Sequence, residues 1–556
     1  MRPAAATAAA AAAAVLSFST CSYATSTSGV AFRSVLATAI PSNGRGCSND
    51  SSNNNGGMHP SPPRPSRAYP QGCSSQPPSY YDYENMAFPP EHLRANLVRS
   101  ADDFGLTRRL GAGKFSDVFE AVDLVEERRL SESYMAGDKG TTHADQEVDP
   151  RTLVVIKCLK PVSDRKVRRE LLVLTHASSL PNLARLRGVV VPDTTTAAIA
   201  AVKEKADGAG TAGQIPPGGV ASVSSRARSA ATMPSLILEH AGRQSRWLCH
   251  GRGTDSKQTT ATEDDDEDDQ DSLYLSEYEI KYYLFHLLVA LDALHSRGVM
   301  HRDVKPRNTL INRSATYPRR DGLGNSRSGL SSPSLSPQSG AVLDGERNSL
   351  MLVDLGLADF YLPGQRYNVR VASRHYKAPE LLVGNEYYDY AVDLWGVGCI
   401  LAGLLFRREP FFRGRDNVDQ LAKISSVLGP NDLTVYCRRV GIDLSTELNA
   451  AVLKYSSRAG PNGSRRPWRD FVTGSCPEPG NDALDLLDRL LVYDHLERYT
   501  AREAMAHSFF DDVRGRVKDE IRSRSRDRHA ISHTVQSTSS IRYGARENWR
   551  KYDAQM

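Results

Sequence analysis

A short segment of the sequence places a carboxylate, an amine and an amide within six residues of one another. The segment His-Arg-Asp-Val-Lys-Pro-Arg-Asn contains Asp303, Lys305 and Asn308. Phosphoryl transfer needs a carboxylate to orient the attacking hydroxyl, a cation near the transferred phosphate and a ligand for a metal ion. We therefore predict catalytic roles for these three residues, with Asn308 also binding the metal.

A second candidate metal ligand, Asp354, follows a short apolar stretch and precedes Leu355 and Gly356. A lone Asp-x-Gly sequence more often marks a turn. After an apolar strand, however, it places a carboxylate beside phosphate groups, where the carboxylate can hold Mg²⁺. Together with Asn308, Asp354 is the predicted magnesium site.

A glycine-containing segment and a lysine–glutamate pair predict a nucleotide site in the first half of the chain. Glycines at 111 and 113 would let backbone amides approach phosphate oxygens. Lys157 ends an apolar stretch, and Glu170, thirteen residues later, is its expected ion-pair partner. Taken singly, these features also fit a hairpin turn and a surface ion pair. The residues predicted to bind ATP are Leu110, Gly111, Gly113, Ser116, Val118, Lys157, Glu170, Glu239, Ala241 and Asp354.

The elements that must position these residues change in type along the chain. Short apolar, β-branched segments predict strands at 106–110, 118–122, 153–159 and 236–239, with one helix at 167–177. After Ser276 the apolar spacing becomes helical, with predicted helices at 278–295, 394–406 and 483–491. This order predicts an α+β fold of two lobes, a β-rich N-lobe with one main helix and a helical C-lobe.

Composition divides the 556 residues into a folded domain, two flanking segments and several insertions. We predict a low-complexity N-terminal segment at 1–78, a domain at 79–512 and a basic tail at 513–556. Within the domain, the N-lobe spans about 100–241 and the C-lobe about 272–512. Stretches too polar to build a core predict surface insertions near 130–150, 192–232, 243–271 and 313–348.

Overall charge and cysteine usage exclude several classes of protein. The net charge of +5 is small for this length and predicts no nucleic-acid partner. The eight cysteines include no C-x-x-C pair, which argues against a structural metal site. No apolar run approaches the roughly 18–20 residues that a membrane span requires.

The segment 301–308 closely resembles the catalytic loop of protein kinases. Within that superfamily, the chain resembles the casein kinase II catalytic subunit over about residues 79–512. The resemblance is most specific at 354–380, with Tyr-Asn-Val-Arg-Val-Ala-Ser-Arg at 367–374, and continues at 406–412 and 416–421. It implies a serine/threonine kinase that uses ATP and Mg²⁺, with Glu380 and Arg498 forming a buried structural pair.

The resemblance also implies how activity is regulated. The activation segment from Leu357 to Lys377 contains no threonine, and Ser373 stands where the family uses it to support the catalytic loop. We therefore expect constitutive activity. The competing expectation is phosphorylation of Tyr361, Tyr367 or Tyr376. In the family, a segment like that at 80–84 packs on the activation segment and holds it open.

Basic residues predict acidic protein substrates, because clustered cations attract acidic peptides. The predicted substrate-binding residues are Arg370, Arg374, Lys377 and Lys166. Ser163 and Asp164 stand where the family has lysines, which would weaken selection of acids further downstream. A solvated basic face is the alternative interpretation.

Several alternatives for the partner, the function and the compartment also fit the sequence. The family binds a regulatory, beta-type subunit through its N-lobe, but the insertion at 192–232 disfavours that partner here. A pseudokinase scaffold, or a kinase of the same group with another substrate preference, is the alternative function. The expected compartment is cytoplasm or nucleus. The first 49 residues contain no acidic side chain, so plastid or secretory targeting is the alternative.

Overall fold

The computed structural model describes residues 64–72, 97–135, 149–191, 233–242, 247, 274–313, 349–474 and 476–535. All of them belong to one compact unit formed by Pro63–Val191 and Ser222–Met556. The first 63 residues, the segment at 80–84 and most of the four predicted insertions lie outside the described residues.

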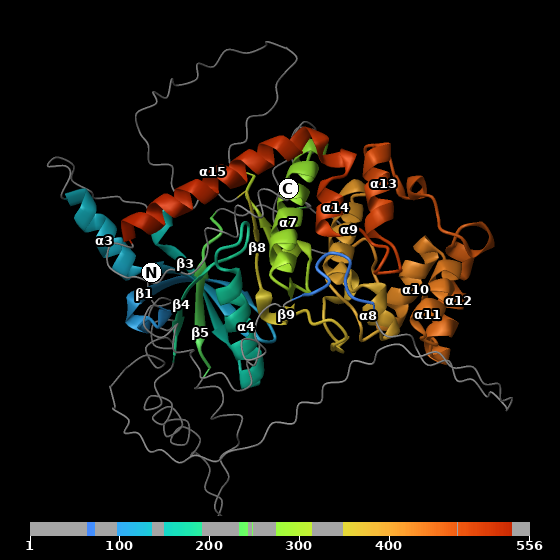
Figure 1. Ribbon diagram of the computed structural model, residues 1–556, viewed down its shortest axis with the longest axis horizontal. Coiled ribbons are helices and arrows are strands. Elements are labelled where there is room, and N and C mark those ends of the chain that lie inside the picture. The colour runs from blue at the N-terminus through green and yellow to red at the C-terminus, as the bar shows by residue number, and fades with distance from the viewer. Residues whose placement is uncertain are drawn as a thin grey trace, which may run out of the picture. The chain divides into compact units, whose positions relative to one another are not determined.

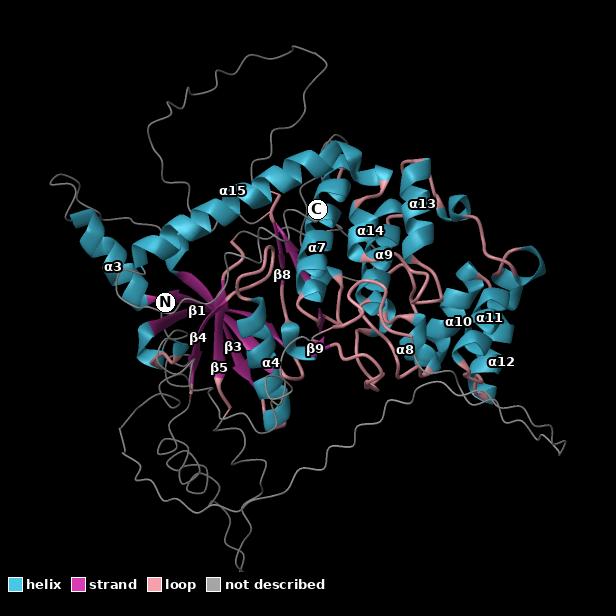
Figure 2. Cartoon of the chain, viewed as in Figure 1, coloured by secondary structure: helices cyan, strands magenta, loops and turns pink. Residues whose placement is uncertain are grey.

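The first part of the unit is an antiparallel five-stranded sheet in the order β1-β2-β3-β5-β4. Its strands are β1 (Phe104–Ala112), β2 (Ser116–Asp123), β3 (Leu153–Leu159), β4 (Leu186–Val190) and β5 (Ser235–Glu239). Figure 2 shows these strands gathered beside α4. The four predicted strands lie within β1, β2, β3 and β5. The strand β4 was not predicted, because Arg187 and Gly188 interrupt its short apolar run.

Two helices accompany this sheet. The helix α4 (Asp164–Ala177) begins three residues before its predicted start and buries Val167, Leu171 and Leu174 along one face. The helix α3 (Leu124–Met135) extends into the first residues of the predicted insertion near 130–150. Its Glu, Arg and Leu residues favour a helical conformation. Residues 136–148, which follow it, lie outside the described residues.

The second part is helical, and α7 (Glu277–Ser296) lies at its centre (Figure 1). A capping box between Ser276 and Glu279 starts α7, and most of its side chains are buried. The other helices are α8 (Pro379–Val383), α9 (Ala391–Leu405), α10 (Asn417–Leu428), α11 (Pro430–Val440), α12 (Thr446–Tyr455), α13 (Asn481–Leu490), α14 (Ala501–Met505) and α15 (Asp511–Val535). The predicted helices at 278–295, 394–406 and 483–491 correspond to α7, α9 and α13. None of the described helices is long and apolar enough to cross a membrane.

Two small two-stranded antiparallel sheets are formed by the segments between α7 and α8. In the first, β6 (Val299–Met300) pairs with β9 (Asp359–Phe360). In the second, β7 (Thr309–Ile311) pairs with β8 (Leu350–Leu352) across the predicted insertion at 313–348. The residues with predicted catalytic roles lie at the ends of these short strands. This architecture confirms the predicted α+β fold of two lobes.

Two features bear on the predicted domain boundary and scaffold. Arg498 binds Glu380 through two hydrogen bonds of 2.8 and 3.0 Å, and both side chains are fully buried, which confirms the expected pair. Residues 513–521, assigned to the tail from composition, form part of α15. Val513, Val517 and Ile521 are buried there at a spacing of four residues, so this stretch packs on the core.

Candidate active site

The structure brings the three predicted catalytic side chains together on the loop after β6. One carboxylate oxygen of Asp303 accepts from Lys305 Nζ at 2.5 Å and from Asn308 Nδ2 at 3.1 Å. Its other oxygen accepts from the backbone N–H of Ser373 at 2.8 Å. Lys305 also donates to Ser373 Oγ at 2.8 Å. The activation segment therefore helps to hold the carboxylate and the amine in place.

A buried carboxylate, Asp393 at the start of α9, fixes the backbone of this loop. It accepts from the N–H groups of His301 and Arg302 at 2.8 and 2.7 Å, and it pairs with His295 Nε2 at 2.9 Å. Although burial alone would raise the pKa of Asp393, the hydrogen bond and charge of His295 lower it overall. Arg302 has a φ of +65°, which is costly for a residue with a Cβ, and these bonds offset that strain.

The predicted nucleotide residues from both parts of the chain meet at Lys157. Its Nζ lies 2.7 Å from Glu170 Oε1 on α4 and 2.7 Å from Asp354 Oδ1 after β8. Burial opposes the charged amine, but the two carboxylates together raise the pKa of Lys157. Burial would likewise raise the pKa of Asp354, and the charge of Lys157 outweighs it, so that pKa is lowered. Both partners are therefore held in their ionised forms.

The catalytic loop and Asp354 are coupled directly through the backbone. His301 Nε2 lies 3.1 Å from the carbonyl oxygen of Val353, and the Val353 N–H donates to the Asn308 carbonyl at 2.8 Å. A Cβ at Gly356 would lie 3.3 Å from both Asp354 Oδ1 and Glu170 Oε2. The absence of a side chain at Gly356 therefore provides the space in which Lys157, Glu170 and Asp354 meet.

The glycine segment forms the turn between β1 and β2. The Gly113 N–H donates to the Ser116 carbonyl at 2.8 Å, and Gly111 pairs with Val118 across the hairpin. A Cβ added at Gly111 would meet no atom within 4 Å. Since packing does not require glycine at 111, the open space beside its backbone is suited to a phosphate group.

The remaining predicted nucleotide residues lie at the end of β5. The Glu239 carboxylate accepts from Arg185 at 2.8 and 2.9 Å, so its side chain is engaged in the scaffold. Ala241 is buried against Ala184 and Met351. The Leu110 side chain on β1 is partly exposed.

The arrangement is suited to Mg²⁺. Asn308 uses its amide nitrogen on Asp303, so its amide oxygen is the atom it would offer to a cation, and Asp354 offers a carboxylate oxygen. Oxygen ligands are those that Mg²⁺ prefers, and nucleotide phosphates complete such sites. Among the described residues, no cluster of three or more His, Cys, Asp or Glu side chains could hold a metal ion. Asn308 and Asp354 would therefore hold it together with the nucleotide.

The predicted substrate-binding residues differ in exposure. Arg370, Arg374 and Lys166 are exposed. Lys166 lies 5.4 Å from the centre of the Phe115 ring, at the tip of the glycine segment. Lys377 is buried, donates to the Val369 carbonyl at 3.2 Å, and has a pKa lowered by burial. Its amine therefore supports the activation segment.

Two arginines that were not predicted from the sequence lie beside this cluster. Arg413 and Arg415 are exposed on the loop before α10. Arg374 donates a hydrogen bond to the Arg415 carbonyl, and His375 Nε2 lies 3.2 Å from the Gly414 carbonyl. The two arginines are visible in the sequence Phe-Arg-Gly-Arg-Asp at 412–416. Their contact with Arg374, however, is visible only in the structure.

A second missed feature is the carboxylate of Asp359 on β9. It accepts from Arg302 Nη2 at 2.9 Å and from Arg169 Nη1 at 3.1 Å. Arg302 also donates to the Leu357 carbonyl at 2.7 Å. Asp359 thus joins α4, the catalytic loop and the start of the activation segment in one ionic cluster.

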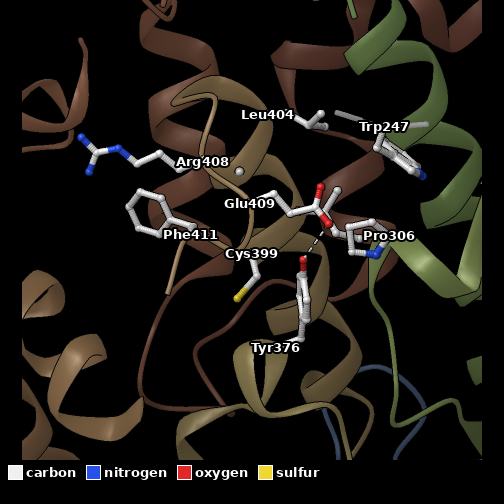
Figure 3. A pocket seen from close by; sticks show the side chains of 10 residues that line it. Trp247, Pro306, Tyr376, Cys399, Leu404, Arg408, Glu409 and Phe411 are labelled. Atoms are coloured by element: carbon white, nitrogen blue, oxygen red, sulfur yellow. Dashed lines mark hydrogen bonds between the residues drawn. The ribbon is translucent and has the colours of Figure 1, made fainter. Parts of the chain in front are cut away.

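The side of the catalytic loop near Pro306 is closely packed (Figure 3). A cavity of only about 10 Å³ lies there, lined by Pro306, Tyr376, Cys399 and Glu409 among others. Tyr376 points toward Glu409, with 3.4 Å between the hydroxyl and the carboxylate (Figure 3). Trp247, from the predicted insertion at 243–271, is buried and donates to the Thr309 carbonyl at 2.6 Å. Part of that insertion therefore supports the loop.

Residues 259–510 match a family model described as a protein kinase domain. The matched region includes the catalytic loop, Asp354, Glu380 and Arg498. The matched region begins after the five-stranded sheet and does not include Lys157, Glu170 or the glycine segment. The structure places these residues at the site.

Proposed function

We propose that this chain, of which residues 259–510 match a protein kinase domain model, transfers the γ-phosphoryl group of ATP to serine and threonine hydroxyls of acidic proteins. One observation carries the proposal. Lys157 bridges Glu170 and Asp354, while Asp303, Lys305 and Asn308 converge on the loop coupled to Asp354. Pseudokinases usually lack at least one of these parts, which disfavours a scaffold without activity.

Each side chain would perform a distinct part of the transfer. Asp303 would accept a hydrogen bond from the substrate hydroxyl and orient it, and Lys305 would stabilise charge on the transferred phosphate. Lys157, fixed by Glu170, would bind the α- and β-phosphates. Bound Mg²⁺ supplies neutralisation of phosphate charge, and Asn308 and Asp354 are the residues that would hold it.

The ion pairs of the activation segment support constitutive activity. In kinases that are switched by phosphorylation, an added phosphate orders this segment by pairing with arginines. Here the Asp359 carboxylate already pairs with Arg302 and Arg169. Tyr361 and Tyr367 are buried, and their hydroxyls bond the Ser66 N–H and the Phe360 carbonyl. These contacts disfavour phosphorylation of either tyrosine as a requirement for activity.

The exposed arginines support acidic substrates. Arg370, Arg374, Arg413 and Arg415 lie on two segments that touch each other, near the expected path of the residues after the phosphoacceptor. Focused positive potential favours carboxylates there and disfavours basic substrates. Serine/threonine specificity rests on the resemblance to the casein kinase II catalytic subunit. A regulatory subunit remains a prediction that the insertion at 192–232 disfavours.

The test compares the phosphatase-treated chain with its D303N variant on matched acidic and basic peptides. We expect Mg²⁺-dependent labelling of serine or threonine in acidic peptides, and a loss of at least about 100-fold in kcat for D303N. The D303N protein should remain folded at the assay temperature, which thermal unfolding checks, since the Asn oxygen can still accept from the Ser373 N–H. Equal labelling by both proteins would exclude Asp303 from the reaction. A preference for basic or proline-containing peptides would instead support a related kinase with another specificity.

A further inference from the structure

A single carboxylate on α15, Glu520, lies at a junction of buried polar groups. Its Oε2 accepts from the Tyr282 hydroxyl at 2.6 Å, and Arg516 donates to Oε1 at 2.8 Å. His286 Nε2 lies 3.5 Å from Oε2. Tyr282 and His286 are one turn apart on α7, and α15 contacts α7, passing over one end of it in Figure 1. Glu520 follows the region that matches the kinase family, so that resemblance assigns it no role.

The first set of contacts leads from Glu520 to the beginning of β8. The Tyr282 hydroxyl, besides donating to Glu520, lies 2.7 Å from Ser349 Oγ, and Ser349 directly precedes β8. The Ser349 carbonyl accepts from the Asn312 N–H at 3.0 Å. Because 36 residues separate Asn312 and Ser349, β7 and β8 are not joined by the two-residue connection that sets the register of a tight hairpin. A side-chain anchor at Ser349 supplies that constraint.

The second set of contacts leads from Glu520 to the end of β8. His286 Nδ1 lies 3.0 Å from Asn182 Nδ2, which also donates to the His286 carbonyl at 2.9 Å. The amide nitrogen can only donate, so Nδ1 accepts and the ring proton lies on Nε2, facing Glu520. The Asn182 carbonyl accepts from the Leu352 N–H at 2.7 Å, two residues before Asp354. Asn182 has a φ of +56°, a conformation that these bonds support.

We propose that Glu520 is a positioning residue that holds both ends of β8, and thereby the metal-binding carboxylate of Asp354, through Tyr282 and His286. The proposal rests on the proposed function, because Asp354 acts only in phosphoryl transfer. Docking of α15 does not require Glu520, since Val513, Val517 and Ile521 already anchor that helix in the core. Glu520 is only half-buried, with 24% of its side chain exposed, so its ion pair adds little stability and is better explained by the geometry it imposes.

The experiment uses the full chain and three variants: E520A, E520Q and D519A. Asp519 is the control, because it is the preceding residue on α15, its side chain is 79% exposed, and it pairs only loosely with Arg522 at 3.6 Å. We expect E520A to lower kcat about tenfold with peptide KM within twofold, and to speed amide exchange in peptides covering 349–356. E520Q keeps an acceptor for the Tyr282 hydroxyl, so kcat should return to within about threefold of the native value. D519A should match the native chain in both measurements.

The outcomes separate this inference from the proposed function. If the native chain transfers no phosphate, the proposed function fails, while amide exchange at 349–356 still reports the coupling. If E520A lowers the melting temperature but leaves kcat and exchange at 349–356 unchanged, Glu520 is merely structural and the inference is overturned. Should E520A fail to fold, Y282F removes a single hydroxyl from the same junction. Unchanged kcat and exchange in Y282F would then overturn the inference.

Discussion

Individual ionised side chains determine whether this site is assembled. Arg302 is almost fully buried, so its guanidinium charge must be compensated within the protein. Asp359 supplies the carboxylate, and the same group binds Arg169 on α4 next to Glu170. One side chain therefore couples the catalytic loop to the helix that orients Lys157.

We predict that D359N destabilises the protein by about 2–4 kcal/mol, because it leaves a buried guanidinium without its counter-charge. The variant should also lower kcat about tenfold at a temperature where it remains folded. Urea unfolding and steady-state kinetics check both expectations. The control is E386Q, which removes an exposed carboxylate 3.7 Å from Arg366 and should change stability by less than about 1 kcal/mol. A D359N protein as stable and as active as E386Q would contradict the role assigned to Asp359.

At the scale of elements, the position of α4 controls the active arrangement. Its Glu170 must stay near Lys157, and its last turn packs His176 against Phe360 of β9, with ring centres 5.9 Å apart in an edge-to-face arrangement. Burial, together with the nearby charge of Arg297, lowers the pKa of His176 to about 4. The contact between α4 and β9 is therefore made by a neutral imidazole.

This pKa makes stability depend on mildly acidic pH. The folded pKa lies below the ordinary value of 6.5, so the unfolded chain binds a proton that the folded chain excludes between pH 6.5 and about 4. Stability should therefore fall as pH decreases through this window. Between pH 7 and pH 5, we expect the native chain to lose about 2 kcal/mol more than H176Q, which cannot titrate. Urea unfolding at both pH values measures the difference, and equal losses would refute the prediction.

At the scale of the whole molecule, the basic residues proposed to bind substrate come from segments far apart in the sequence. Lys166 begins α4 beside Phe115, whereas Arg370 and Arg374 lie on the activation segment. Arg413 and Arg415 come from the loop before α10, where Asp419 lies 3.5 Å from Arg415 and partly offsets its charge. Ser163 and Asp164 add no positive charge to α4, so downstream acids should depend on the loop at 413–415.

We predict that the double variant R413A/R415A raises KM about tenfold for a peptide with acids at several downstream positions. A peptide with one acid directly after the phosphoacceptor should change less, because Arg370 and Arg374 remain. The matched control is R438A/R458A, which removes two exposed charges elsewhere in the helical part. Raising the salt concentration should shrink the difference between the two double variants. Equal KM values for both double variants on both peptides would show that the loop does not select substrates.

The sequence by itself indicated the candidate chemistry of this protein, four strands of its main sheet and four of its helices. Short sequence motifs identify Asp303, Lys305, Asn308 and Asp354. Such motifs can be recognised because each depends only on residues a few positions apart in the chain. Strands β1, β2, β3 and β5 and helices α4, α7, α9 and α13 followed from apolar periodicity, which depends on neighbours a few residues apart. The buried pair of Glu380 and Arg498 was also expected, from the resemblance.

Only the tertiary structure decided which distant charges meet. The pairing of Asp359 with Arg302 and Arg169, the burial of Lys377 and the approach of Arg413 and Arg415 to Arg374 join segments separated by tens to hundreds of residues. Composition misassigned residues 513–521 to a tail, because α15 is polar overall and buries only every fourth side chain. Ionic contacts and helix docking depend on packing between elements, and a one-dimensional pattern of residue types does not contain that information.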